Sequence, residues 1–231
     1  SNNLEQATNL SNHKEMAKAL NGLGAVSSEG KDYNKSITYH KQALEIRKNI
    51  NDLKGVGGSL HNLGVVHFYQ NKASKAEKYY KEALKIFEKI DYKKSSANCF
   101  FNFGMLYSIT GEYKKALKNC LRAYEINKQL GAKAKIGNCF VKIAYIYNRM
   151  GDFDKALDYA LKGLDIQESF EDEIVISETL YHTATIYDNK GDYIRALDTY
   201  IKLYELDSKI YKNDSEIVAH SIAGIGITYY Y

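Results

Sequence analysis

Residues 95–134 read SSANCFFNFGMLYSITGEYKKALKNCLRAYEINKQLGAKA, and this stretch sets the structural pattern of the whole chain. Its first half carries aromatic residues at intervals of three and four positions: Phe100, Phe103 and Tyr107. That spacing places them on one face of an α-helix. Gly111 then interrupts the pattern, as glycine often does at a helix end, and a second amphipathic run follows over residues 113–126. The stretch therefore predicts two helices joined by a short turn.

The same pattern recurs every 40 residues without an insertion or deletion. A small residue occupies one slot of the first helix throughout: Gly24, Gly64, Gly104, Ala144, Ala184 and Gly224. Regular self-similarity of this length is typical of solenoids, in which each unit buries its apolar face only against its neighbours. The sequence therefore predicts an all-α fold, a right-handed α-α superhelix of about five and a half helix-pair repeats.

The composition agrees with a nearly all-helical protein that has no membrane-spanning segment. Proline is absent from the 231 residues, although average usage would give about eleven, and proline breaks helix interiors. The net charge of +4 comes from 32 basic and 28 acidic residues without a Lys/Arg-rich run, which argues against direct nucleic-acid binding. No apolar stretch is long enough to insert into a membrane, and no signal peptide is visible.

Three cysteines are present, and Cys99 and Cys139 share one repeat slot. An odd number without a CxxC pair favours small buried side chains in a reducing compartment over disulfides or metal ligands. We therefore expect a cytoplasmic location, or a periplasmic one if a longer protein carries a signal or membrane segment.

The repeat resembles the tetratricopeptide repeat family over essentially the whole chain. The shared features are a large residue, the small slot, an aromatic residue, a Gly-x-aromatic turn and an alanine of the second helix: Phe100, Gly104, Tyr107, Gly111 and Ala116 in the third unit. HEAT and armadillo units overlap in length but lack this turn. The usual unit has 34 residues and a final proline, so this 40-residue form predicts a second helix about a turn and a half longer. It is similar to repeats of bacterial signalling proteins and of the kinesin light chain and spindle-orientation families.

The repeat register predicts a single array over residues 1–231. We expect repeats near 14–53, 54–93, 94–133, 134–173 and 174–213. Residues 1–13 match the tail of a preceding second helix, and residues 214–231 match a lone first helix. This register suggests a fragment of a longer protein; the alternative is a natural domain whose open end is covered by a second copy.

The resemblance implies that the first helix of each pair lines a concave groove that recognises an extended protein or peptide segment. Carried onto this chain, the groove positions include amides, apolar side chains and basic side chains: Asn62, Asn98, Asn102 and Asn138; Phe101, Met105 and Tyr145; Lys142, Arg149 and His182. An amide offers two donors and an acceptor, so it can pair with a peptide backbone of any sequence. The basic group suits a carboxylate or an acidic segment.

Simpler interpretations exist for each of these residues. Asn98 and Asn138 are also compatible with capping or solvating the first helix, and Lys142 and Arg149 with solvated charges. The two Lys, one Arg and two Asn of the carboxylate-clamp subfamily are not matched, which argues against binding of chaperone tails.

No sequence motif indicates an enzyme, a cofactor or a metal site. His61 and His67, for example, are six residues apart and point to different sides of a helix. The rival function is a structural or oligomerisation module. It would form a homodimer through the open ends near Ile222, Ile225 and Tyr229.

Overall fold

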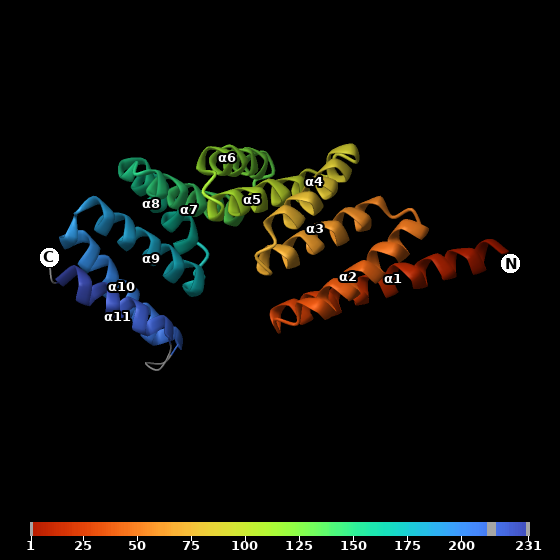
Figure 1. Ribbon diagram of the computed structural model, residues 1–231, viewed down its shortest axis with the longest axis horizontal. Helices are drawn as coiled ribbons and strands as arrows, with labels where there is room; N and C mark the ends of the chain where they lie inside the picture. The colour runs from red at the N-terminus through yellow and green to blue at the C-terminus, as the bar shows by residue number, and fades with distance from the viewer. Residues whose placement is uncertain (1, 212–215, 230–231) are drawn as a thin grey trace. The chain divides into compact units, whose positions relative to one another are not determined.

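A computed structural model describes the backbone of residues 2–211 and 216–229; the side chains of residues 2–8 and 227 are not described. These residues form eleven α-helices and no strand (Figure 1), which confirms the all-α class. The helices are α1 (Asn2–Glu29), α2 (Tyr33–Asn49), α3 (Leu53–Tyr69), α4 (Ala73–Lys89), α5 (Lys93–Ile109), α6 (Tyr113–Gln129), α7 (Lys133–Met150), α8 (Phe153–Glu168), α9 (Glu173–Lys190), α10 (Tyr193–Tyr211) and α11 (Glu216–Tyr229). We call the odd-numbered helices A helices and the even-numbered ones B helices.

Every turn between consecutive helices from α1 to α10 uses the same backbone device. One residue with positive φ ends each helix, at intervals of 20 residues: Lys31, Asn51, Asn71, Asp91, Gly111, Gly131, Gly151, Glu171 and Gly191. A left-handed residue satisfies the last carbonyls of a helix and reverses the chain. In five turns the next residue is an aspartate whose carboxylate accepts a backbone N–H of the following helix: Asp32, Asp52, Asp152, Asp172 and Asp192. The half-unit of helix and turn thus repeats as strictly as the whole unit.

Two sequence-based details require correction. The prediction of a longer second helix is wrong, because α3, α4, α5 and α6 each have 17 residues. The additional length is shared by both helices, which keeps the two packed faces of a hairpin equal. In addition, residues 2–13, which belong to the segment expected as the tail of a separate helix, continue into the following helix within α1.

The chain divides into two compact units, residues 1–111 with α1–α5 and residues 112–231 with α6–α11. Within each unit every helix packs on the next one in sequence. Consecutive A helices also touch, α1 with α3, α3 with α5 and α7 with α9, whereas consecutive B helices stay further apart. In both units, therefore, the A helices line the inner side of the stack. A single array with the repeat boundaries given above remains a proposal.

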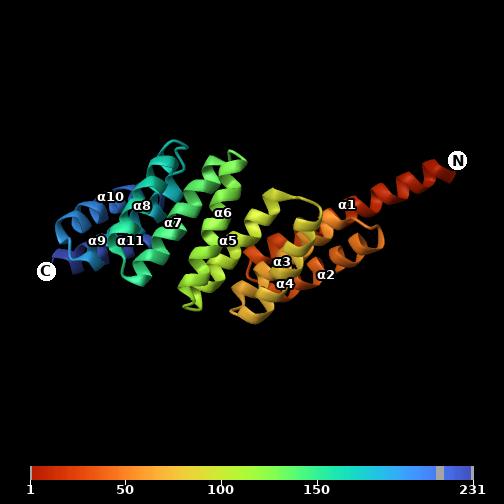
Figure 2. The same ribbon diagram turned by 90° about the horizontal axis from the view of Figure 1, so that it is seen from above.

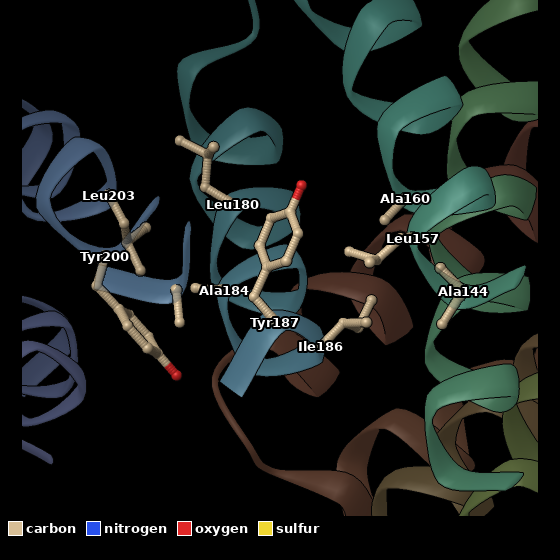
Figure 3. Packing of buried hydrophobic residues seen from close by; sticks show 11 residues of the cluster. Ala144, Leu157, Ala160, Leu180, Ala184, Ile186, Tyr187, Tyr200 and Leu203 are labelled. Atoms are coloured by element: carbon tan, nitrogen blue, oxygen red, sulfur yellow. The ribbon is translucent and has the colours of Figure 1, made fainter. Parts of the chain in front are cut away.

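Hydrophobic clusters between neighbouring hairpins hold each unit together. In the second unit, Ala144, Ala160, Leu180, Ala184 and Tyr200 belong to one such cluster (Figure 3). In the first unit, Leu60, Leu63 and Phe87 pack in another, together with the buried Cys99. Cys120 and Cys139 are buried as well, which confirms the prediction that the cysteines are core residues.

In the first two repeats the small slot has a ring of the following B helix beside it. A Cβ atom placed on Gly64 would lie 2.5 Å from Cδ1 of the buried Tyr80. Gly24 stands in the same relation to the ring of His40, at 2.6 Å. The glycine thus marks the closest approach of the A and B helices.

Candidate binding faces of the A helices

The first inner face belongs to α3 and α5 in the first unit. We define it by six half-buried side chains: His61, Asn62, Asn98, Phe101, Asn102 and Met105. Nδ2 of Asn102 lies 2.8 Å from Nε2 of His61, one repeat earlier in the chain. Because an amide nitrogen only donates, the imidazole nitrogen must accept this hydrogen bond. Burial lowers the pKa of His61, which keeps the ring neutral and able to accept.

This hydrogen bond changes the role expected for Asn102. One of its two N–H donors is used inside the protein, and its carbonyl oxygen and second N–H remain for a ligand. The bond also fixes the orientation of the amide, so that the free groups are positioned before any ligand arrives. Asn62 lies beside His61 in sequence, and a hydrogen bond between these two side chains partly offsets the lowered pKa of His61.

Asn98 and Asn138 do not cap the A helices. The N-cap positions of α5 and α7 are Tyr92 and Ala132, so each asparagine lies well inside its helix. Both side chains are half-buried. The structure thus removes the capping interpretation, and the position of both amides on the inner side of their helices stays a prediction.

The second inner face belongs to α7 and α9 in the second unit. We define it by Asn138, Lys142, Tyr145, Arg149 and His182. Nζ of Lys142 lies 5.1 Å from the ring centroid of Tyr145, within the range of a cation–π contact. The Tyr145 ring in turn meets the His182 ring edge to face, with 5.7 Å between centroids. The structure therefore brings Lys142 and Tyr145 of α7 together with His182 of α9, which follows Tyr145 by 37 residues in the chain.

The electrostatics of this group favour an anion. Burial lowers the pKa of Lys142, and burial together with the nearby Lys142 lowers the pKa of His182 to about 4. His182 is therefore neutral at pH 7. Among the residues whose side chains are described, no carboxylate forms an ion pair with Lys142. The nearby carboxylate of Glu178 offsets part of the lowering of the Lys142 pKa, and further negative charge from a ligand would stabilise the half-buried ammonium group.

Arg149 is more exposed than the other residues of this face and makes a hydrogen bond to a neighbouring B helix. It is exposed at the end of α7, and its Nε donates to the hydroxyl of Tyr113 in α6 at 3.2 Å. That hydrogen bond raises the pKa of the guanidinium. Four of its five donors remain available to a ligand.

Sequence reasoning missed that polar side chains of consecutive A helices pair with each other. Besides Asn102 with His61, Nδ2 of Asn189 donates to Oδ1 of Asn148 at 3.0 Å. Both pairs are separated by 41 residues, one more than the repeat length. A search of the sequence for polar pairs at this separation would have found them.

Two further properties bear on function. Among the side chains that the structure describes, no group of three or more His, Cys, Asp and Glu could hold a metal ion. None of the helices described over residues 2–211 and 216–229 is both long enough and apolar enough to cross a bilayer.

Antiparallel helix hairpins that stack through conserved slots, with polar and aromatic side chains on their A helices, define a helical-repeat scaffold that binds proteins. The chain belongs to the tetratricopeptide repeat family. One family model, described as tetratricopeptide repeat, matches residues 15–89 and 94–169. A second model with the same description matches residues 177–210. Comparison with curated proteins gives no match.

Solved structures agree on the fold. BtubC (BKLC) from P. vanneervenii is 18% identical with a TM-score of 0.74, covering 92% of this chain and 93% of that one. A Rap protein in complex with competence and sporulation factor is 16% identical with a TM-score of 0.74, covering 91% and 64%. A signal transduction ATPase with a tetratricopeptide repeat sensor from Pyrococcus horikoshii is 18% identical with a TM-score of 0.70, covering 94% and 37%.

Proposed function

We propose that the chain binds an extended peptide segment of a partner protein along the inner faces of its A helices, without chemistry of its own. The observation that carries this proposal is the half-buried Lys142, whose Nζ lies over the ring of Tyr145 and which forms no ion pair within 4.0 Å among the described residues, although Glu178 is close enough to act on its pKa. Burying the ammonium group of a lysine destabilises the fold unless an opposite charge, here from a ligand, compensates the lost hydration.

The two faces would supply different parts of recognition. On the first inner face, the amides of Asn62, Asn98 and Asn102 offer donors and acceptors to a peptide backbone, and Phe101 and Met105 offer apolar contact area. On the second inner face, Lys142 and Arg149 would receive acidic side chains or a terminal carboxylate, next to Asn138 and the rings of Tyr145 and His182. The proposed ligand is therefore an extended segment with at least one acidic group.

The similarity to a Rap protein in complex with a factor, and to the repeat sensor of a signalling ATPase, supports a sensory or scaffolding role. We propose that this role belongs to a bacterial signalling or regulatory protein and operates in the cytoplasm. The likeness extends to the fold, so the identity of the partner has to come from experiment.

The experiment starts with selection of peptides from a displayed random library on the immobilised protein. Affinities of the selected peptides are then measured by calorimetry. The double substitution Asn62→Ala and Asn102→Ala is expected to weaken binding about thirtyfold, because each of the two lost hydrogen bonds contributes on the order of 1 kcal/mol. Lys142→Gln is expected to reduce affinity for acidic peptides most strongly.

The matched control is Asn49→Ala. Asn49 is exposed at the end of a B helix, so this substitution makes the same chemical change away from the A helices. Helix content by circular dichroism should stay the same in all variants. Equal affinity of the wild type and the double variant for every selected peptide would contradict the proposal.

A second candidate function is self-association, favoured by apolar side chains on α11. Ile222 is 52% exposed and Tyr229 is 80% exposed. Ile225, by contrast, packs against the core cluster of the second unit and is a poor probe of an interface. Ile222→Asp is therefore expected to dissociate a dimer without loss of folding, as measured by sedimentation equilibrium over a range of concentrations. A wild type that remains monomeric throughout that range removes this candidate.

A further inference from the structure

A pocket of about 360 Å³ lies between α9, α10 and α11 in the second unit. These three helices run side by side in both views (Figure 1 and Figure 2). Tyr181, Tyr211 and Ile217 form apolar parts of its wall, and Asp207 forms part of its floor. The volume is in the range of sites that hold small ligands or a single side chain.

Asp207 is the unusual feature of this pocket. Its side chain belongs to a residue that is only 1% exposed. One carboxylate oxygen accepts from Oγ of Ser177 at 2.5 Å. Oγ of Ser221 lies 3.2 Å from the other carboxylate oxygen and 3.0 Å from the carbonyl oxygen of Val218, so these two acceptors share its single proton. Among the residues that the structure describes, no cation pairs with this carboxylate. A buried carboxylate is costly unless a positive charge or further hydrogen bonds compensate it.

Comparison of repeat slots shows that two departures from the repeat pattern, Ser177 and His220, meet in this pocket, whereas the slot of Asp207 is polar in three of the four earlier repeats. The slot of Asp207 holds Arg47, Phe87, Asn127 and Gln167 in the earlier repeats. The slot of Ser177 otherwise holds small apolar residues: Ala17, Gly57, Ala97 and Gly137. The slot of His220 otherwise holds large apolar residues: Leu20, Leu60, Phe100, Phe140 and Leu180. Asp207, Ser177 and His220 all line the pocket, although packing of the repeats is achieved elsewhere without polar groups at the last two slots.

The bonding of Asp207 indicates what would fit. A carboxylate has about four acceptor positions, of which the two serines use one on each oxygen. One position on each oxygen remains, and two parallel acceptors match the planar donor fork of a guanidinium. The rings of Tyr181 and Tyr211 offer surfaces for the flat cation and its alkyl stem. Glu178 adds a second carboxylate to the lining.

We propose that this pocket binds an alkylguanidinium group, carried either by a free arginine-like small molecule or by an arginine side chain of a peptide. The inference goes beyond the proposed peptide binding on the inner faces and stands without it. The neighbouring His182 would not oppose the cation, because burial keeps its pKa at about 4 and the ring neutral. Asp207 and Glu178 carry the negative charge of the pocket lining, and Lys142, which acts on both Glu178 and His182, offsets part of it.

The test is calorimetric titration of the full chain with butylguanidinium and with butylurea, its neutral isostere. The guanidinium compound is expected to bind at least about tenfold more tightly, since a charge-assisted pair is roughly twice as strong as a neutral one. Free arginine and the peptide Gly-Gly-Arg-Gly-Gly form two further arms. Tighter binding of one of them identifies the source of the group.

Asp207→Asn is expected to lower the affinity for butylguanidinium at least about tenfold, because it removes the charge and keeps the shape. Ser177→Ala, which places a residue common in that slot, is expected to lower it severalfold. Glu205→Gln is the matched control, since Glu205 is an exposed carboxylate on the same helix. The affinity of this variant for butylguanidinium should equal that of the wild type. Absence of butylguanidinium binding by the folded wild type would overturn the proposal. So would equal affinity of the wild type, the Ser177→Ala variant and the Asp207→Asn variant.

Discussion

Lowering the pH from 7 to about 4.5 is expected to reduce the free energy of unfolding by about 3 kcal/mol through buried histidines. Burial, with the nearby Arg47, lowers the pKa of His40 from 6.5 to about 4. Burial, with Lys142, does the same for His182. His61 and His67 are shifted in the same direction. The histidine contribution to stability should therefore be lost in the mildly acidic range.

The direction follows from proton binding in the two states. Between pH 6.5 and about 4 the unfolded chain binds a proton at each of these sites, whereas the folded chain does not. The stabilisation is therefore complete above pH 6.5 and falls as the pH drops through this window. Urea unfolding followed by circular dichroism at several pH values measures the effect.

His40→Tyr provides the matched control for this prediction. The slot of His40 holds Tyr80 and Tyr200 in other repeats, and Tyr80 faces Gly64 as His40 faces Gly24. A tyrosine should therefore fit without titrating in this range, although it changes the contact from His40 Nδ1 to Oδ1 of Asn21. The variant is expected to lose part of the pH dependence while folding normally at pH 7. An unchanged pH dependence would show that His40 is not the source.

Gly64→Ala is expected to destabilise the first unit by about 2–3 kcal/mol, the upper part of the usual range for overpacking. The added methyl group would lie 2.5 Å from two carbon atoms of the Tyr80 ring. This ring cannot move aside easily, because it is only 1% exposed and packs edge to face against Phe103, with 5.6 Å between centroids. Urea unfolding at pH 7 measures the loss.

Gly58→Ala in the same helix is the control, and it should raise the free energy of unfolding where Gly64→Ala lowers it. A Cβ atom there meets only Nη1 of Arg47, at 3.8 Å. Replacing glycine by alanine inside a helix stabilises it by about 0.5–1 kcal/mol when space is free. If both substitutions change stability in the same direction, the ring contact of Gly64 is not what the slot requires.

The 40-residue period was enough to predict the helices, their pairing and the small slot, because each slot appears in several repeats and occasional departures such as His220 do not obscure it. Helical spacing and glycine turns act locally, so they can be recognised without knowledge of distant contacts. The face of the A helices that carries Asn102 and Lys142 followed from the same register.

The partners of these side chains depend on contacts that the repeat pattern does not encode. The hydrogen bond from Asn102 to His61 and the edge-to-face contact of Tyr145 with His182 join different repeats through the packing of neighbouring A helices. The pocket around Asp207 requires three helices at once. A one-dimensional pattern fixes which residues share a slot. The distances across helices, and with them burial and charge, arise only when the hairpins pack.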